Sequence, residues 1–143
     1  RQAHCPQAVC RRTDRGLESG PVNSPQIPNQ RAIIDRRALA DAIDALVQEH
    51  GPQARAKVVA LLRSALDGGR AEIARRLADK PSAGHECAGA QSFLIDQLVR
   101  VVHDHVTAHV YPAANRSSAE RLAMLAVGGY GRAEMAPHSD VDI

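Results

Sequence analysis

The chain has 143 residues, of which 44% are hydrophobic and 2% aromatic, and its formal net charge at pH 7 is +2. This length suits one modest domain with an aliphatic core, and the small net charge gives no reason to expect a nucleic-acid or membrane partner. No apolar run is long enough to cross a bilayer, and no signal peptide is recognisable. Three cysteines (Cys5, Cys10 and Cys87) at irregular spacing favour reduced thiols, so we expect a cytoplasmic protein.

Both ends of the sequence are unusual. The chain begins with Arg1, its first methionine is Met124, and its last residue, Ile143, lies within a pattern typical of a strand. We therefore interpret the chain as a fragment, and the functional predictions below concern the intact protein.

Residues 1–30 are rich in Pro, Arg, Ser and Gln and have no apolar periodicity. They predict a disordered or non-native tail, and we recognise no motif in them. Cys5 and Cys10 lie in this tail without a second Cys/His pair at zinc-finger spacing, which favours two unpaired thiols over half a metal site.

Residues 31–114 have the apolar periodicity of helices and predict a bundle-like region. Asp35 is placed to cap a first helix. The apolar residues of this helix recur at intervals that put them on one face, namely Leu39, Ile43, Leu46 and Val47. Gly51-Pro52 is expected to end it.

Two longer helices follow in the predicted bundle. One runs to Pro81, with Gly68-Gly69 as a candidate bend or break, because a mid-helix glycine costs about 1 kcal/mol relative to alanine. The other covers roughly residues 88–110 and ends at Tyr111-Pro112. Its expected inward residues are Leu94, Ile95, Leu98, Val101, Val102 and Val106.

The last of these helices carries His103, His105 and His109, of which the second and third are one helical turn apart. Two histidines without a third ligand are a weak metal signal, and a solvated helix face explains them more simply. We expect no chemistry from the helices.

Residues 115–143 have a different character. Ser117 and Glu120 have the spacing of a capping box, which indicates a short helical turn. Residues 122–127 form an apolar run that ends in glycines, which predicts a buried strand leading into a tight turn.

The chemistry is expected after this strand. Gly128, Gly129 and Gly131 allow the backbone to turn sharply and approach a ligand closely. A helix over residues 131–136 would point its first N–H groups at the turn, which suits a triphosphate. Arg132 is a candidate for a charge-assisted phosphate contact.

Two carboxylates follow the turn. Asp140 and Asp142 alternate with apolar residues, as in a half-buried strand, so their side chains are expected to share one face. Neighbouring carboxylates repel unless a cation joins them, and oxygen ligands beside a phosphate favour Mg²⁺. A glycine turn with paired aspartates therefore predicts phosphoryl or nucleotidyl transfer.

A lone glycine pair or a lone Asp-x-Asp is weak, but their order and separation are specific. A strand, a Gly-Gly turn, a short helix and a Ser-Asp-x-Asp strand in succession resemble the nucleotidyltransferase superfamily that includes DNA polymerase beta. The resemblance implies an α+β fold, in which a helical bundle-like region over residues 31–114 is followed by the truncated start of a polymerase-beta-like sheet over residues 115–143.

The fuller string Gly-Gly-Tyr-Gly-Arg-x-Glu-x-x-Pro-x-Ser-Asp-x-Asp resembles the bifunctional uridylyltransferase/uridylyl-removing enzymes of bacterial nitrogen control. The resemblance extends from about residue 31 to the end, and the family usually has glycine where this chain has Ala133. It implies transfer of UMP from UTP to a tyrosine of the PII protein, and its removal when glutamine, the expected effector, is high.

The resemblance also implies residue roles. Asp140 and Asp142 would hold Mg²⁺, while Gly128 and Gly129 would cradle the phosphates. Arg132 and Ser139 are further candidates, for phosphate contact and for positioning the aspartate strand. Arg132 has the alternative of pairing with Glu134, and Ser139 that of capping a turn.

The superfamily needs a third carboxylate on a later strand, and the chain ends before one, so we expect the 143-residue chain alone to be inactive. Two alternatives remain open at this point. One is another nucleotidyltransferase, such as the adenylyltransferase that acts on glutamine synthetase. The other is a non-catalytic helical interaction module.

Overall fold

A computed structural model describes residues 27–112 and 124–143. Most of the predicted tail, with Cys5 and Cys10, and the capping box of Ser117 and Glu120 lie outside the described residues. Among the helices of the described part, none combines the length and apolarity needed to cross a membrane.

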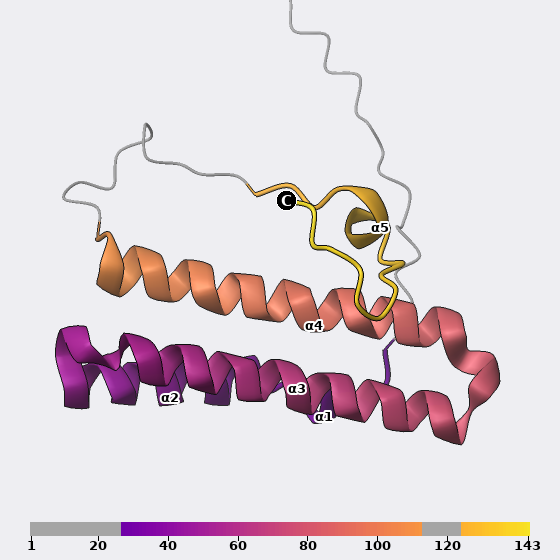
Figure 1. Cartoon of the computed structure of the whole chain (residues 1–143), viewed down its shortest axis with the longest axis horizontal. Helices are drawn as coiled ribbons and strands as arrows, with labels where there is room; N and C mark the ends of the chain where they lie inside the picture. Colours follow the sequence, from indigo (N-terminus) through magenta and orange to yellow (C-terminus); the bar gives the residue numbers. More distant parts are fainter. Residues whose placement is uncertain (1–26, 113–123) are drawn as a thin grey trace, which may run out of the picture.

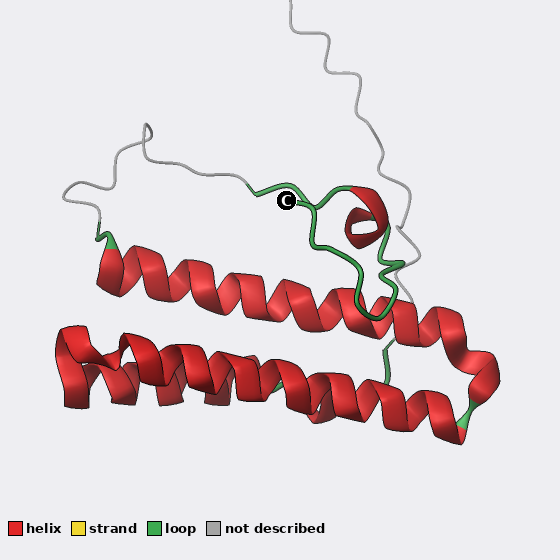
Figure 2. Ribbon diagram, viewed as in Figure 1, coloured by secondary structure: helices red, strands yellow, loops and turns green. Residues whose placement is uncertain are grey.

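Three long helices, α2 (Arg36–His50), α3 (Arg55–Asp79) and α4 (Gly84–His105), lie alongside one another, and a loop that carries the short helix α5 (Gly128–Gly131) lies against α4 (Figures 1 and 2). Short 3₁₀ turns at Gly51–Ala54 and Pro81–Ala83 connect the long helices, and a π-helical turn at Val106–Val110 extends α4. The helices are α1 (Gln30–Ile33), α2 (Arg36–His50), α3 (Arg55–Asp79), α4 (Gly84–His105) and α5 (Gly128–Gly131).

The predicted cap of the first long helix is confirmed. Oδ1 of Asp35 accepts hydrogen bonds from the backbone N–H groups of Arg37 and Ala38, both at 3.1 Å. These bonds satisfy N–H groups of the first turn that lack partners within the helix. Gly51 then ends α2 with a positive φ of 54°, a conformation that glycine adopts without strain.

The core of the bundle is aliphatic, as the composition indicated. Leu94 of α4 has no exposed surface, and Ile43 of α2 is 1% exposed. The expected inward face of α4 is confirmed for Leu94, Ile95 and Val101, whereas Val102 is 41% exposed. The buried cluster comprises Ile33, Ile34, Leu39, Ile43, Ala54, Val58, Ile73, Cys87, Ala90, Leu94 and Val101.

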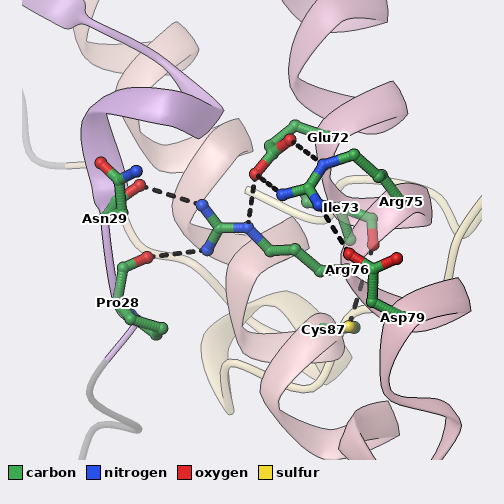
Figure 3. A network of polar contacts seen from close by, with 8 residues as sticks. All are labelled: Pro28, Asn29, Glu72, Ile73, Arg75, Arg76, Asp79 and Cys87. Carbon is green, nitrogen blue, oxygen red and sulfur yellow. Dashed lines mark hydrogen bonds and ion pairs between the residues drawn. The ribbon is translucent and has the colours of Figure 1, made fainter.

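Charged residues of α3 fasten the start of the described chain to the bundle (Figure 3). The Arg76 guanidinium donates to the carbonyl oxygens of Pro28 and Asn29 at 2.7 and 3.0 Å, and to Glu72 at 2.9 Å. Hydrogen bonds from Arg75 and then Arg76 lower the pKa of Glu72 to about 2. Arg76 therefore ties the residues just before α1 to the last turns of α3.

The expected sheet is the main error of the sequence analysis. The described residues are 77% helical and contain no strand, so the α+β assignment is wrong for this structure. Met124, Leu125 and Val127, expected in a buried strand, belong to no helix or strand and are 46%, 73% and 53% exposed. They face residues 140–143 through a single backbone bond, from the Val127 N–H to the Asp142 carbonyl at 3.1 Å. One hydrogen bond between two short segments does not form a β-sheet. A stable sheet needs further strands and an apolar face that packs against other elements.

Candidate functional site

The glycine-rich segment is docked on helix α4 through two large side chains. Tyr130 and Met135 are 8% and 2% exposed and form a second apolar cluster with Ile95 of α4. Leu66 of α3 and Val99 of α4 pack at its edge. Burial raises the pKa of the Tyr130 hydroxyl; the nearby Asp96 carboxylate adds to this effect and Arg100 opposes it.

A buried serine adds a polar contact to this docking. Ser92 of α4 is 5% exposed, and its Oγ accepts the Met135 backbone N–H at 3.3 Å. The same hydroxyl donates to the Ala88 carbonyl of its own helix at 3.2 Å. The contact leaves neither the serine hydroxyl nor the Met135 N–H unpaired in the interior, where an unpaired polar group would be costly.

The glycine turn has a different backbone path from the one expected. One helical turn spans Gly128–Gly131, instead of a helix over residues 131–136. The N–H of Gly131 donates to Val127 at 2.9 Å, and the N–H of Glu134 donates to Gly129 at 2.9 Å. Ala133, with a φ of 57°, ends the turn in the left-handed region, and a helix cannot continue through that conformation.

The structure brings one predicted carboxylate against the glycine turn. Gly128 has a φ of 59°, and a Cβ at this position would lie 2.9 Å from Oδ2 of Asp142. The backbone bond between Val127 and Asp142 holds the two segments together at this point. A side chain at residue 128 would therefore be strained and would also displace the carboxylate.

The other predicted site residues are arranged less closely. Asp140 is exposed, two residues before Asp142, and Gly129 adjoins Gly128 in the turn. Arg132 Nε donates to Glu134 at 3.3 Å, and the Ser139 hydroxyl donates to the Ala136 carbonyl at 3.1 Å. For both residues, the structure has the contact that the sequence analysis named as the alternative.

The donor set of this segment suits a hard cation. Asp140 and Asp142 are exposed and supply carboxylate oxygens, the ligands that Mg²⁺ takes in small numbers beside water and phosphate. Across the described ranges, no three His, Cys, Asp or Glu side chains form a metal-binding group. Two carboxylates would leave a bound metal to draw its remaining ligands from substrate and water.

His103, His105 and His109 lie in the last turn of α4 and the π-helical turn that follows it, whereas the glycine turn docks beside Ser92 and Ile95. His109 Nε2 is 3.1 Å from Oδ1 of Asp44 on α2, and the rings of His105 and His109 have centroids 5.4 Å apart. Burial, followed by the charge of His109, lowers the pKa of His105. This cluster connects α2 to the end of α4 and takes no part in the glycine–aspartate site.

The structure adds detail to the role expected of Gly131 and shows that sequence reasoning gave no role to Ser92, Tyr130 and Met135, which also shape the site. A Cβ on Gly131 would overlap the Ala126 carbonyl oxygen, so this third glycine permits a close backbone approach. Ser92 was overlooked, although a serine among the inward residues of an apolar helix indicates a polar partner. Tyr130 and Met135 are apolar residues within a polar loop, and that pattern was the available signal for their docking.

Comparison with known proteins identifies similar chains. A protein of Novosphingobium aromaticivorans is 68% identical over 119 residues, which is 83% of this chain and 13% of that protein. A protein of Erythrobacter litoralis is 61% identical over 122 residues, which is 85% of this chain and 13% of the relative. A protein of Rhodospirillum rubrum is 44% identical over 121 residues, or 83% of this chain and 13% of the relative.

All three relatives are named bifunctional uridylyltransferase/uridylyl-removing enzyme. The resemblance inferred from the glycine–aspartate pattern is therefore confirmed. The chain spans about 13% of the length of these curated relatives. No family model matches the chain, and no solved structure matches it.

Proposed function

We propose that this chain contributes the nucleotide-binding turn and two metal-binding carboxylates to a bifunctional uridylyltransferase/uridylyl-removing enzyme. The reaction is transfer of UMP from UTP to a tyrosine of the PII protein. The names of relatives that are 44% to 68% identical support this activity. The glutamine effector rests on the family resemblance alone.

The observation that carries the proposal is the position of Asp142. Its carboxylate lies beside the Cα of Gly128, in the place that a side chain there would fill. A nucleotide bound at the glycine turn would thus have its phosphates next to this carboxylate. The Asp142 carboxylate and the phosphates of a bound nucleotide are both negatively charged, so they need a cation between them. Nucleotidyl transfer requires this arrangement.

Each residue of the segment has a defined task in this proposal. The backbone N–H groups of Gly128, Gly129 and Tyr130 belong to the first turn of a helix and have no acceptor within it, so they are suited to phosphate oxygens. Asp140 and Asp142 would hold Mg²⁺, which neutralises the charge that develops on the phosphates. Arg132 would reach phosphate only by leaving Glu134, an exposed pair that costs little to break.

The test is UMP transfer to PII by the full-length protein that contains this chain. We expect Asp142→Ala to lower the transfer rate by more than about 100-fold. Mutation of a group that only hydrogen-bonds to a metal ligand already lowers metal affinity or activity about 10- to 100-fold, and Asp142 is a proposed ligand itself. The matched control is Asp67→Ala, which removes an exposed aspartate from α3 and should leave the rate unchanged.

Two results would count against the proposal. Transfer of AMP in preference to UMP would favour the alternative of another nucleotidyltransferase. Mg²⁺ or Mn²⁺ binding that is unaffected by the double change Asp140→Ala and Asp142→Ala would favour a non-catalytic module.

We also expect the 143-residue chain alone to transfer no UMP, because two carboxylates do not complete the metal site.

A further inference from the structure

We infer that Ser92 is a positioning residue for nucleotide binding, which makes helix α4 the platform that holds the glycine turn in its binding shape. The inference rests on the proposed function, because the substrate it concerns is the nucleoside triphosphate bound at that turn. Ser92 lies on α4, remote in sequence from the turn, and acts through Met135.

The first step is the contact between the helix and the loop. The Oγ of Ser92 accepts the Met135 N–H while it donates to the Ala88 carbonyl, so the hydroxyl is fixed in direction by its own helix. Ser92 is 5% exposed, and water is therefore a poor substitute for it. Loss of the hydroxyl leaves the Met135 N–H unpaired in a buried place, which disfavours the docked loop.

The second step is the rigidity of the loop between its two anchors. Tyr130 and Met135 are both buried against Ile95 and are the fixed ends of the segment that closes the glycine turn. Between these ends, the Ala133 N–H donates to Tyr130 at 3.0 Å and the Glu134 N–H donates to Gly129 at 2.9 Å. The position of Met135 on α4 therefore determines where Gly129 lies.

The third step connects the loop to the carboxylate. Gly128 adjoins Gly129, and its Cα is covered by the side chain of Asp142. The Val127 N–H to Asp142 carbonyl bond closes the same loop from the other side. A shift of Met135 away from Ser92 would consequently separate the glycine amides from Asp142 and weaken nucleotide binding.

The experiment compares Ser92→Ala with Ser64→Ala in the full-length protein. Both changes replace a helical serine with alanine, but Ser64 is exposed on α3. Binding of the Mg²⁺ complexes of UTP, ATP, CTP and GTP is measured, together with the kcat and KM of UMP transfer. Amide hydrogen exchange of residues 128–143 reports the docking of the loop independently of activity.

We expect Ser92→Ala to raise the Kd and KM for UTP about five- to tenfold, the effect of one lost buried hydrogen bond. The kcat should change little, and exchange at Met135 and Glu134 should become faster, whereas Ser64→Ala should change none of these. Ser92→Cys, which keeps the size but has a weak sulfur acceptor, should give an intermediate shift.

Several outcomes would decide against Ser92. Unchanged UTP affinity with unchanged exchange over residues 128–143 would overturn the inference while UMP transfer, and with it the proposed function, stood. A lower melting temperature with unchanged affinity would also overturn it, because Ser92 would then only stabilise the bundle. If the protein instead prefers ATP, the proposed function fails, and weaker ATP binding in Ser92→Ala would still support the positioning role.

Discussion

At the scale of single residues, Ala133 has a strained backbone conformation within the site. Its φ of 57° lies in the left-handed region, where an L-residue with a Cβ is strained by roughly 1–2 kcal/mol. From the family resemblance, the sequence analysis expected glycine at this position. Glycine would adopt this left-handed conformation at the end of the turn without the strain.

We predict that Ala133→Gly stabilises the docked loop by about 0.5–1 kcal/mol, because relief of strain outweighs the greater freedom of glycine in the unfolded chain. Ala136 has no positive φ, so Ala136→Gly should destabilise the loop by up to about 1 kcal/mol. Near-UV circular dichroism of buried Tyr130 during urea unfolding measures both. Equal effects of the two changes would contradict the strain at residue 133.

At the scale of elements, the contact between α3 and α4 depends on one glycine. The sequence analysis considered Gly68-Gly69 as a bend or break, whereas α3 runs unbroken from Arg55 to Asp79. A Cβ on Gly69 would lie 2.6 Å from Cδ1 of Leu94 and 2.9 Å from the Ile33 carbonyl oxygen. Gly69 is therefore a point of close approach between helices, and its cost in helix propensity is offset by that packing.

The neighbouring glycine provides a matched comparison. We predict that Gly69→Ala destabilises the bundle by about 1–3 kcal/mol, because Leu94 is fully buried and has no room to move. A Cβ on Gly68 would meet nothing within 4 Å, so Gly68→Ala should stabilise the helix by about 0.5–1 kcal/mol. Chemical denaturation followed by far-UV circular dichroism tests the pair, and a stabilising Gly69→Ala would refute the close contact.

At the scale of the whole molecule, the described part has two apolar clusters of unequal size. The larger cluster draws on residues between Ile27 and Val101 and contains nothing from the glycine segment. The smaller consists of Ile95, Tyr130 and Met135, and Leu66 contacts both. The helical bundle is thus complete without the site that it supports.

We predict that a chain of residues 27–112 retains its helical circular dichroism and melts cooperatively, because its core remains intact. Removal of residues 27–34 from the 143-residue chain should be far more damaging, since Ile33 and Ile34 belong to the larger cluster and are 3% and 8% exposed. Loss of helix in the first truncation, with the second still folded, would show that the clusters are wrongly divided.

The sequence by itself determined the helices and the resemblance to the named relatives. Apolar spacing, the Asp35 cap and the breaks at Gly51-Pro52 and Pro81 are local signals, and a helix satisfies its hydrogen bonds locally. The order of glycines and aspartates likewise indicated the resemblance to the named relatives, because that pattern is read along the chain. The domain boundaries and the metal ligands remain predictions.

Only the tertiary structure decided how the last segment is arranged. A strand is defined by the hydrogen bonds to its partner strands, so residues 124–127 and 140–143, with a single backbone bond between them, form none. Docking on α4 instead depends on contacts distant in sequence, from Met135 to Ser92 and from Tyr130 to Ile95. Periodicity within one segment carries no information about such contacts, and these contacts hold Asp142 beside Gly128.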